Sequence, residues 1–170
     1  MPPKFGTSGL RGLVTDLSDG LCAAYTRAFM GACGHPDTLL IGRDLRPSSP
    51  RIAAAVAAGA ASLGVRVVDC GAVPTPALAL AGFARQAPAI MVTGSHIPAD
   101  RNGLKFYTPQ GEITKADEDE ITRRFALETA DSPPPQPTAE IDATVGCALP
   151  CTLHQGLSTC SPGRSDHRRL

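Results

Sequence analysis

The sequence has neither an excess of charge nor a long hydrophobic run, and both absences restrict its function. Its 16 basic and 16 acidic residues give a net charge of zero, which does not favour binding to nucleic acid or anionic membranes. The longest apolar stretch, residues 53–65, is interrupted by Gly59, Ser62 and Gly64 and is too short to span a bilayer. Residues 1–4 lack the apolar run of a secretory signal. We therefore expect a cytoplasmic protein whose six cysteines are reduced thiols.

Two common kinds of catalytic or metal site also lack their motifs. The chain has no Gly-x-Ser-x-Gly nucleophile elbow, and Ser95 and His96 are neighbours that would point to opposite sides of an extended chain. A serine hydrolase is therefore disfavoured. Four residues near the C-terminal end have side chains that bind zinc, but only the first spacing fits a structural zinc site: Cys147, Cys151, His154 and Cys160. Metal analysis would test this alternative.

The composition is that of one globular domain followed by a different kind of segment. A chain of 170 residues has room for one domain of the usual 100–200 residues, and 42% hydrophobic with 19% charged residues is typical of a folded protein. Four prolines between residues 133 and 137 form a stiff linker, after which no helical or strand period persists. We assign residues 1–131 to the domain and 132–170 to a linker and irregular tail.

Helical and strand patterns alternate along residues 1–131. Ser18 can cap a helix that Gly34 ends, and the Ser49 hydroxyl can accept a free amide at the start of another helix. Further helices are predicted at 75–85 and after Thr114, strands at 38–41, 65–70 and 89–92, and a hairpin around 109–111. The pattern predicts an α/β fold of three layers, in which helices cover both faces of a mixed, mainly parallel sheet.

One segment carries the strongest chemical signal, a serine that follows an apolar strand. Ser95 follows Gly94, and Lys105 comes ten residues later. A phosphate on a serine adds about −1.5 to −2 charge and three strong acceptor oxygens that need nearby donors. Gly94 allows a tight turn, and we expect Asn102-Gly103 to form a sharp turn that returns Lys105 toward Ser95.

Three segments in order resemble the α-D-phosphohexomutase family, which includes phosphomannomutase and phosphoglucomutase. They are the serine segment, Phe5-Gly6-Thr7-Ser8-Gly9-Leu10-Arg11-Gly12 and Gly42-Arg43-Asp44-Leu45-Arg46-Pro47-Ser48-Ser49. Only the family's first domain is covered, over roughly residues 4 to 130. Residues after about 140 do not follow the family pattern, and we interpret them as a tail foreign to it, in a truncated or frame-shifted chain.

The resemblance implies a role for each matching residue. Ser95 would carry a phosphate, give it to a hexose phosphate and recover one from a bisphosphate intermediate. Lys105 would be the general acid/base, which requires a pKa closer to neutral than the usual value of about 10.4. Arg11 and His96 would surround the phosphate. Thr7 and Ser8, with Arg11, would contribute to the substrate pocket.

The resemblance also implies a magnesium ion and an activating hexose 1,6-bisphosphate. The family holds magnesium through the phosphoserine, here Ser95, and through three aspartates of an Asp-Gly-Asp-Gly-Asp-Arg loop that this sequence lacks. The implied activity is the interconversion of hexose 1- and 6-phosphates, incomplete in this chain alone. The alternative is a noncatalytic module that binds a phosphosugar or a partner. The sugar and the oligomeric state stay open.

The second family segment has a simpler interpretation in structural terms. Arg43, Asp44 and Arg46 can pair with one another and hold the loop between a strand and the next helix. We favour this role over direct contact with a substrate.

Overall fold

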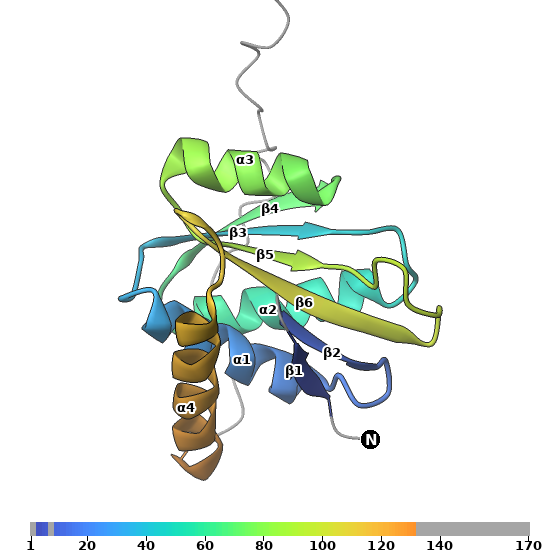
Figure 1. Cartoon of the computed structure of the whole chain (residues 1–170), viewed down its shortest axis with the longest axis horizontal. Helices are drawn as coiled ribbons and strands as arrows, with labels where there is room; N and C mark the ends of the chain where they lie inside the picture. The colour runs from blue at the N-terminus through green and yellow to red at the C-terminus, as the bar shows by residue number, and fades with distance from the viewer. Residues whose placement is uncertain (1–2, 7–8, 132–170) are drawn as a thin grey trace, which may run out of the picture.

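A mixed sheet separates two layers of helices in the computed structural model, which describes residues 3–6 and 9–131 (Figure 1). α3 covers one face of the sheet, while α1 and α2 cover the other and α4 packs beside α1. The elements follow in the order β1 (Lys4–Gly6), β2 (Gly9–Leu13), α1 (Asp19–Ala32), β3 (Thr38–Arg43), α2 (Ser49–Ala61), β4 (Arg66–Ala72), α3 (Thr75–Arg85), β5 (Ala89–Val92), β6 (Arg101–Thr108), β7 (Gly111–Glu112) and α4 (Lys115–Asp131).

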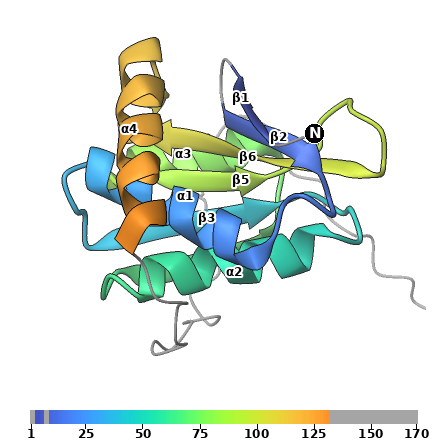
Figure 2. The ribbon, with the colours of Figure 1, turned by 90° about the horizontal axis from the view of Figure 1, so that it is seen from below.

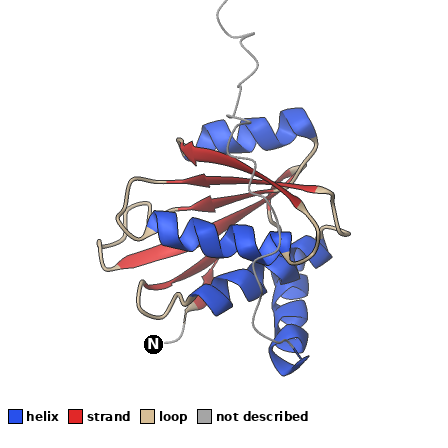
Figure 3. Ribbon diagram, turned by 180° about the vertical axis from the view of Figure 1, so that it is seen from behind, coloured by secondary structure: helices blue, strands red, loops and turns tan. Residues whose placement is uncertain are grey.

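The strands are ordered β1-β2-β6-β5-β3-β4, and β7 pairs with β6. The expected mixed sheet with helices on both faces is confirmed (Figure 3). The expectation that the sheet is mainly parallel is wrong, because only β3 pairs in parallel, with β4 and β5, and the other pairings are antiparallel. The reason is the connection from β5 to β6: a loop without a helix lets β6 return beside β5 in the opposite direction.

The main core lies between the sheet and the layer of α1 and α2 (Figure 2). Phe106 of β6 is its centre, with Phe5 stacked at 5.6 Å and Phe29 of α1 at 5.0 Å between ring centroids. α4 joins this layer through Tyr25 and Phe125, whose rings stack at 3.9 Å. Burial of these rings ties the N-terminal hairpin, α1, α4 and β6 into one unit.

α1 and α2 approach closely at Gly59. A Cβ atom at this position would lie 2.6 Å from the carbonyl oxygen of Ala23 on α1. Real Cβ atoms do not approach backbone so closely, so the contact requires glycine in the middle of α2.

Several local predictions are confirmed. Ser18 caps α1 by accepting a hydrogen bond from the Leu21 amide at 3.2 Å, and α3 spans the predicted residues 75–85. β6 and β7 form the predicted hairpin. The capping role predicted for Ser49 is wrong: Ser48 is the N-cap of α2, and the Ser49 hydroxyl is used in contacts with other elements.

No described helix is long and apolar enough to cross a membrane. The proposed zinc ligands and the rest of the tail lie outside the described residues.

Candidate functional site

The loops that follow β3 and β5 lie at the same end of the sheet, because these parallel strands are neighbours (Figure 1). The loop after β3, residues 44–48, contains Asp44 and Arg46. The loop after β5, residues 93–100, contains Ser95 and is called the serine loop below. The fold therefore brings two of the three family segments together.

Ser95 is exposed and has a left-handed backbone conformation, with φ of +50°. A residue other than glycine in this region costs on the order of 1–3 kcal/mol and is found where surrounding structure enforces it. Two hydrogen bonds contribute here: the Ser95 amide donates to Thr93 Oγ1, and the Gly94 amide to Asp44 Oδ2, both at 2.9 Å. The serine hydroxyl is thus presented to solvent by a constrained turn.

The Arg46 guanidinium holds the serine loop through hydrogen bonds to backbone carbonyl oxygens. Nη1 donates to the carbonyl oxygens of Pro98 at 2.6 Å and Arg101 at 3.1 Å. Nη2 donates to those of Ile97 at 2.6 Å and Ser95 at 3.3 Å, and Nε lies 3.4 Å from Asp44 Oδ2. Of the five N–H donors of an arginine, the four on Nη1 and Nη2 are thus matched by four hydrogen bonds, and the one on Nε faces the Asp44 carboxylate as an ion pair. Arg46 therefore positions the loop and has no donor left for a phosphate.

The predicted pairing of Asp44 with Arg46 is confirmed, since the Arg46 amide also donates to Asp44 Oδ1 at 3.0 Å. Arg43 takes no part in this network. Sequence reasoning missed the larger role of Arg46, which reaches oxygens about 50 residues further along the chain. The signal available was a charged pair directly after a strand parallel to the one that precedes Ser95.

Asn102 supports the same loops from inside the protein. Its side chain is fully buried and its Nδ2 donates to the hydroxyls of Ser48 at 2.8 Å and Ser49 at 2.9 Å. The Ser49 hydroxyl in turn donates to Asp44 Oδ1 at 2.5 Å. The prediction of a sharp turn at Asn102-Gly103 is wrong: both residues belong to β6, and Asn102 Oδ1 accepts a hydrogen bond from the Gly103 amide at 2.8 Å.

Asp44 is held as a carboxylate by these neighbours. Partial burial by itself would raise its pKa, but the hydrogen bonds from the Ser49 hydroxyl and from the backbone amides of Arg46 and Gly94 outweigh burial, and the pKa falls below its usual value. The charge of Asp44 is therefore used to join the two loops.

Lys105 and Arg11 lie on the same face of the sheet as α3. On that face α3 packs mainly against β3 and β5. Arg11 of β2 pairs with Gly103, and Lys105 pairs with Gly9 and with Met91. Alternation along the strands places Arg11 and Lys105 on one face. Both side chains are thus available on the sheet surface near its β2 side, and Arg11 is exposed.

The sequence predicted that Lys105 returns toward Ser95. In the structure its amine instead contacts Glu112 and Tyr107. The register partner of Lys105 on β5 is Met91, four residues before Ser95 in the sequence. Its Nζ lies 3.1 Å from Glu112 Oε1 and 3.5 Å from the Tyr107 hydroxyl. Burial by itself would lower the pKa of Lys105, but the hydrogen bonds and charges of Glu112 and Tyr107 together outweigh burial, and the pKa is raised. This shift is opposite to the one that base catalysis needs.

His96 is exposed in the same turn as Ser95, which a hydrogen bond from the Ile97 amide to the Gly94 carbonyl closes at 3.0 Å. Thr7 and Ser8 lie outside the described residues.

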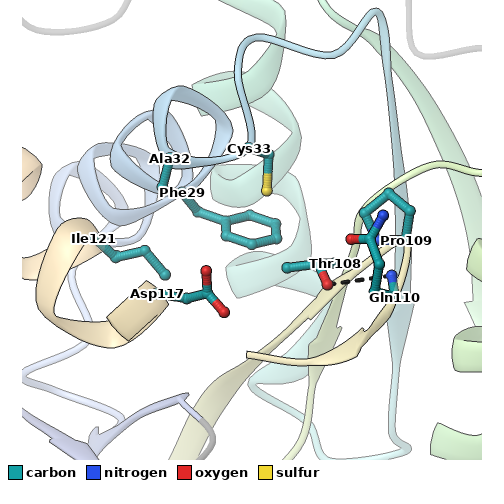
Figure 4. Close-up of a pocket in the computed structure, with 8 residues that line it drawn as sticks. All are labelled: Phe29, Ala32, Cys33, Thr108, Pro109, Gln110, Asp117 and Ile121. Carbon is teal, nitrogen blue, oxygen red and sulfur yellow. Dashed lines mark hydrogen bonds between the residues drawn. The ribbon is translucent and has the colours of Figure 1, made fainter. Parts of the chain in front are cut away.

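A hollow of about 270 Å³ lies at the opposite end of the sheet (Figure 4). Figure 4 shows the Cys33 sulfur and the Asp117 carboxylate among the groups at its wall. Its lining comes from the end of α1, the β6–β7 hairpin and α4: Phe29, Ala32, Cys33, Thr108, Pro109, Gln110, Asp117 and Ile121. β6 separates this hollow from the serine loop, so it is not part of the site around Ser95.

The described residues do not form a magnesium site by themselves. They contain no group of three or more His, Cys, Asp or Glu side chains that could hold a metal ion. Asp44, the carboxylate bonded to the serine loop, already accepts three hydrogen bonds. A phosphate on Ser95 would add one ligand, and the remaining ligands would have to come from elsewhere.

The fold and the loop define a class of protein: an α/β/α domain that exposes a constrained serine at the ends of parallel strands. Residues 2–132 match the family model described as phosphoglucomutase/phosphomannomutase, alpha/beta/alpha domain I. The chain belongs to this family, as the resemblance indicated.

Relatives and solved structures agree with this assignment. The chain is 53% identical to a phosphomannomutase of Sinorhizobium fredii over 78% of its own length and 29% of that protein. It is 40% identical to a phosphoglucosamine mutase of Natranaerobius thermophilus over 71% of its own length and 28% of that protein. A crystal structure titled putative phosphomannomutase from Thermus thermophilus superposes with a TM-score of 0.71 at 26% identity, covering 84% of this chain and 33% of that one. The chain thus spans about 28–33% of the length of these proteins.

Proposed function

We propose that this chain supplies the phosphoserine domain of a phosphohexomutase, which interconverts hexose 1- and 6-phosphates through a bisphosphate intermediate. Family membership and the names of the relatives support the reaction class. The observation that carries the proposal is Ser95 itself, exposed at φ +50° in a loop that Arg46 holds through three of the loop's carbonyl oxygens and that of Arg101 at the start of β6. Such a turn is suited to a serine that must meet a substrate in one fixed geometry.

The proposed step transfers a phosphoryl group from Ser95 to a sugar hydroxyl. The bond between phosphorus and Ser95 Oγ breaks, and a bond between phosphorus and the sugar oxygen forms. The sugar hydroxyl loses its proton to solvent water, and Ser95 Oγ gains one from a general acid. Phosphoryl transfer depends mainly on positioning and on cations that face the transferred group, so a constrained loop contributes directly to the rate.

Lys105 is proposed to supply the proton that Ser95 Oγ receives, and to take it back in the reverse direction. In the present arrangement its amine is bonded to Glu112, so the side chain must leave that carboxylate to reach the serine. Arg11 and His96 are proposed to neutralise the phosphate, and Thr7 and Ser8 to contact the substrate. Arg46 is excluded from phosphate binding by its bonds to the loop.

Magnesium and a hexose 1,6-bisphosphate belong to the proposal for the complete enzyme. The metal would neutralise charge on the transferring group when bound, with ligands that the described residues lack. The sugar is proposed as a hexose phosphate without a choice between mannose, glucose and glucosamine, because the relatives include enzymes named for more than one. The proposed location is the cytoplasm.

A second candidate function is a noncatalytic module that binds a phosphosugar or a partner. The observation in its favour is that the amine of Lys105, the proposed acid/base, is bonded to Glu112 in this structure.

Phosphoryl transfer to the chain separates the two functions. The protein is incubated with glucose 1,6-bisphosphate and magnesium, and each peptide is then weighed by mass spectrometry, with and without added domains 2–4 of a phosphomannomutase relative. We expect a gain of one phosphoryl group on the Ser95 peptide, absent in Ser95→Ala and retained in Ser62→Ala, which removes another exposed serine. No transfer under either condition would favour the noncatalytic module.

A further inference from the structure

Lys105, the last residue of the serine segment, contacts two polar side chains that lie outside the three family segments: Tyr107 and Glu112. Glu112 Oε1 lies 3.1 Å from Lys105 Nζ and accepts a hydrogen bond from the Tyr107 hydroxyl at 3.3 Å. The ammonium also lies 5.9 Å from the centre of the Tyr107 ring. The lysine side chain is 23% exposed, whereas that of Glu112 is 53% exposed.

The β6–β7 hairpin brings the carboxylate to the lysine. Tyr107 and Glu112 are register partners, and Lys105 is two residues before Tyr107, so all three lie on one face of the sheet. The hairpin turn is closed by the Thr108 hydroxyl, which donates to the Gly111 carbonyl at 3.3 Å. Because β7 has only two residues, Glu112 is its one charged side chain.

The other neighbours of Lys105 are not acidic. Met91 of β5 is apolar and Gly9 of β2 has no side chain. Arg11 occupies the next position of the same face on β2 and is a like charge. Among these neighbours and Tyr107, Glu112 is the acidic group that holds the ammonium.

We propose that Glu112 is a positioning residue for Lys105, which keeps the amine charged and turned away from Ser95 until an anionic phosphate competes for it. The inference rests on the proposed function, since it assumes that Lys105 serves the phosphoryl transfer. Because Glu112 keeps the amine protonated, Lys105 enters the reaction as the proton donor to Ser95 Oγ. It leaves Glu112 when the phosphosugar binds.

The test measures the ionisation of Lys105 in the full chain by NMR of labelled lysine side chains across pH, for the parent and for Glu112→Gln. Removal of the carboxylate should lower the Lys105 pKa by at least about half a unit, equal to about a threefold shift in the ionisation constant. Titration with inorganic phosphate should perturb the Lys105 signal at a lower concentration in Glu112→Gln than in the parent. The matched control is Glu118→Gln, which removes an acid from the Lys115 pair and should leave Lys105 unchanged.

An unchanged Lys105 pKa and an unchanged phosphate response in Glu112→Gln would overturn the inference, whatever the variant does to stability. If Glu112→Gln fails to fold, Tyr107→Phe is measured in its place. Loss of the Tyr107 hydroxyl should move the Lys105 NMR signal by less than the titration with phosphate does. A larger effect would refute the assignment of this role to Glu112. The readout is independent of Ser95 phosphorylation. Transfer to Ser95 with an unchanged Lys105 refutes only this inference. A shifted Lys105 without transfer refutes the proposed function and, with it, the role of Lys105 in transfer, and leaves only the control of the Lys105 charge by Glu112.

Discussion

Replacement of Arg46 by methionine tests the structural basis of the serine loop. The substitution keeps most of the aliphatic volume and removes four donated hydrogen bonds, of which those to the carbonyls of Pro98 and Ile97 are short at 2.6 Å. A hydrogen bond to a charged group contributes about 1.5–3 kcal/mol. Water can reach most of the exposed loop, so we count only the two short bonds at the lower value, which gives a loss of about 3 kcal/mol.

Loss of the guanidinium should also release the backbone of Ser95. The left-handed conformation costs on the order of 1–3 kcal/mol, and without Arg46 the turn can relax to a cheaper one. Restoring the original turn for each transfer would then slow phosphorylation of Ser95 by about tenfold, which corresponds to 1.36 kcal/mol. Arg46→Lys should fall between the parent and Arg46→Met, because an ammonium keeps the charge but lacks the planar fork.

Three measurements check this reasoning. Urea unfolding gives the loss of stability, hydrogen exchange of peptides covering 93–101 gives the loop opening, and mass spectrometry gives the rate of Ser95 phosphorylation. Arg51→Met is the matched control, since Arg51 of α2 likewise donates to two loop carbonyls, those of Val14 at 3.2 Å and Leu17 at 3.0 Å, but in a different loop. It should lower stability without opening the serine loop. Equal exchange at 93–101 in Arg46→Met and the parent would refute the argument.

Further substitutions test the supporting structure. Asn102→Ala should lower the free energy of unfolding by about 2–4 kcal/mol, because it leaves buried hydroxyl and amide groups without their partner; a loss below about 0.5 kcal/mol in urea unfolding would contradict this. Gly59→Ala should destabilise by about 1–3 kcal/mol through its clash with α1, although Gly20→Ala, which meets no atom within 4 Å, should stabilise by up to about 1 kcal/mol. Burial raises the pKa of the thiols of Cys22 and Cys33 from 9.0 to about 12. Their contribution to stability should be complete below pH 9 and lost as pH rises toward 12, because the unfolded thiols ionise first; both should be alkylated more slowly in the native than in the urea-unfolded protein, and equal rates would show that they are accessible.

Local chemistry accounts for the features that the sequence predicted well. Caps, prolines and apolar periodicity act over a few residues, so Ser18 at the start of α1 and the bounds of α3 follow from neighbours in the chain. The motif around Ser95 identified the family for the same reason, since its residues are contiguous. Ser95 also lies where the sequence placed it, in a turn directly after a strand.

The remaining features depend on contacts between segments that are distant along the chain or share a strand face. Arg46 meets the serine loop because β3 and β5 are adjacent, and Asn102 is a strand residue because the start of α2 supplies its buried partners. Lys105 points to Glu112 because the β6–β7 register places both on one face. Residue patterns carry no information on which strands become neighbours or which charges meet across them, since the free energy of those contacts arises only when the chain has folded.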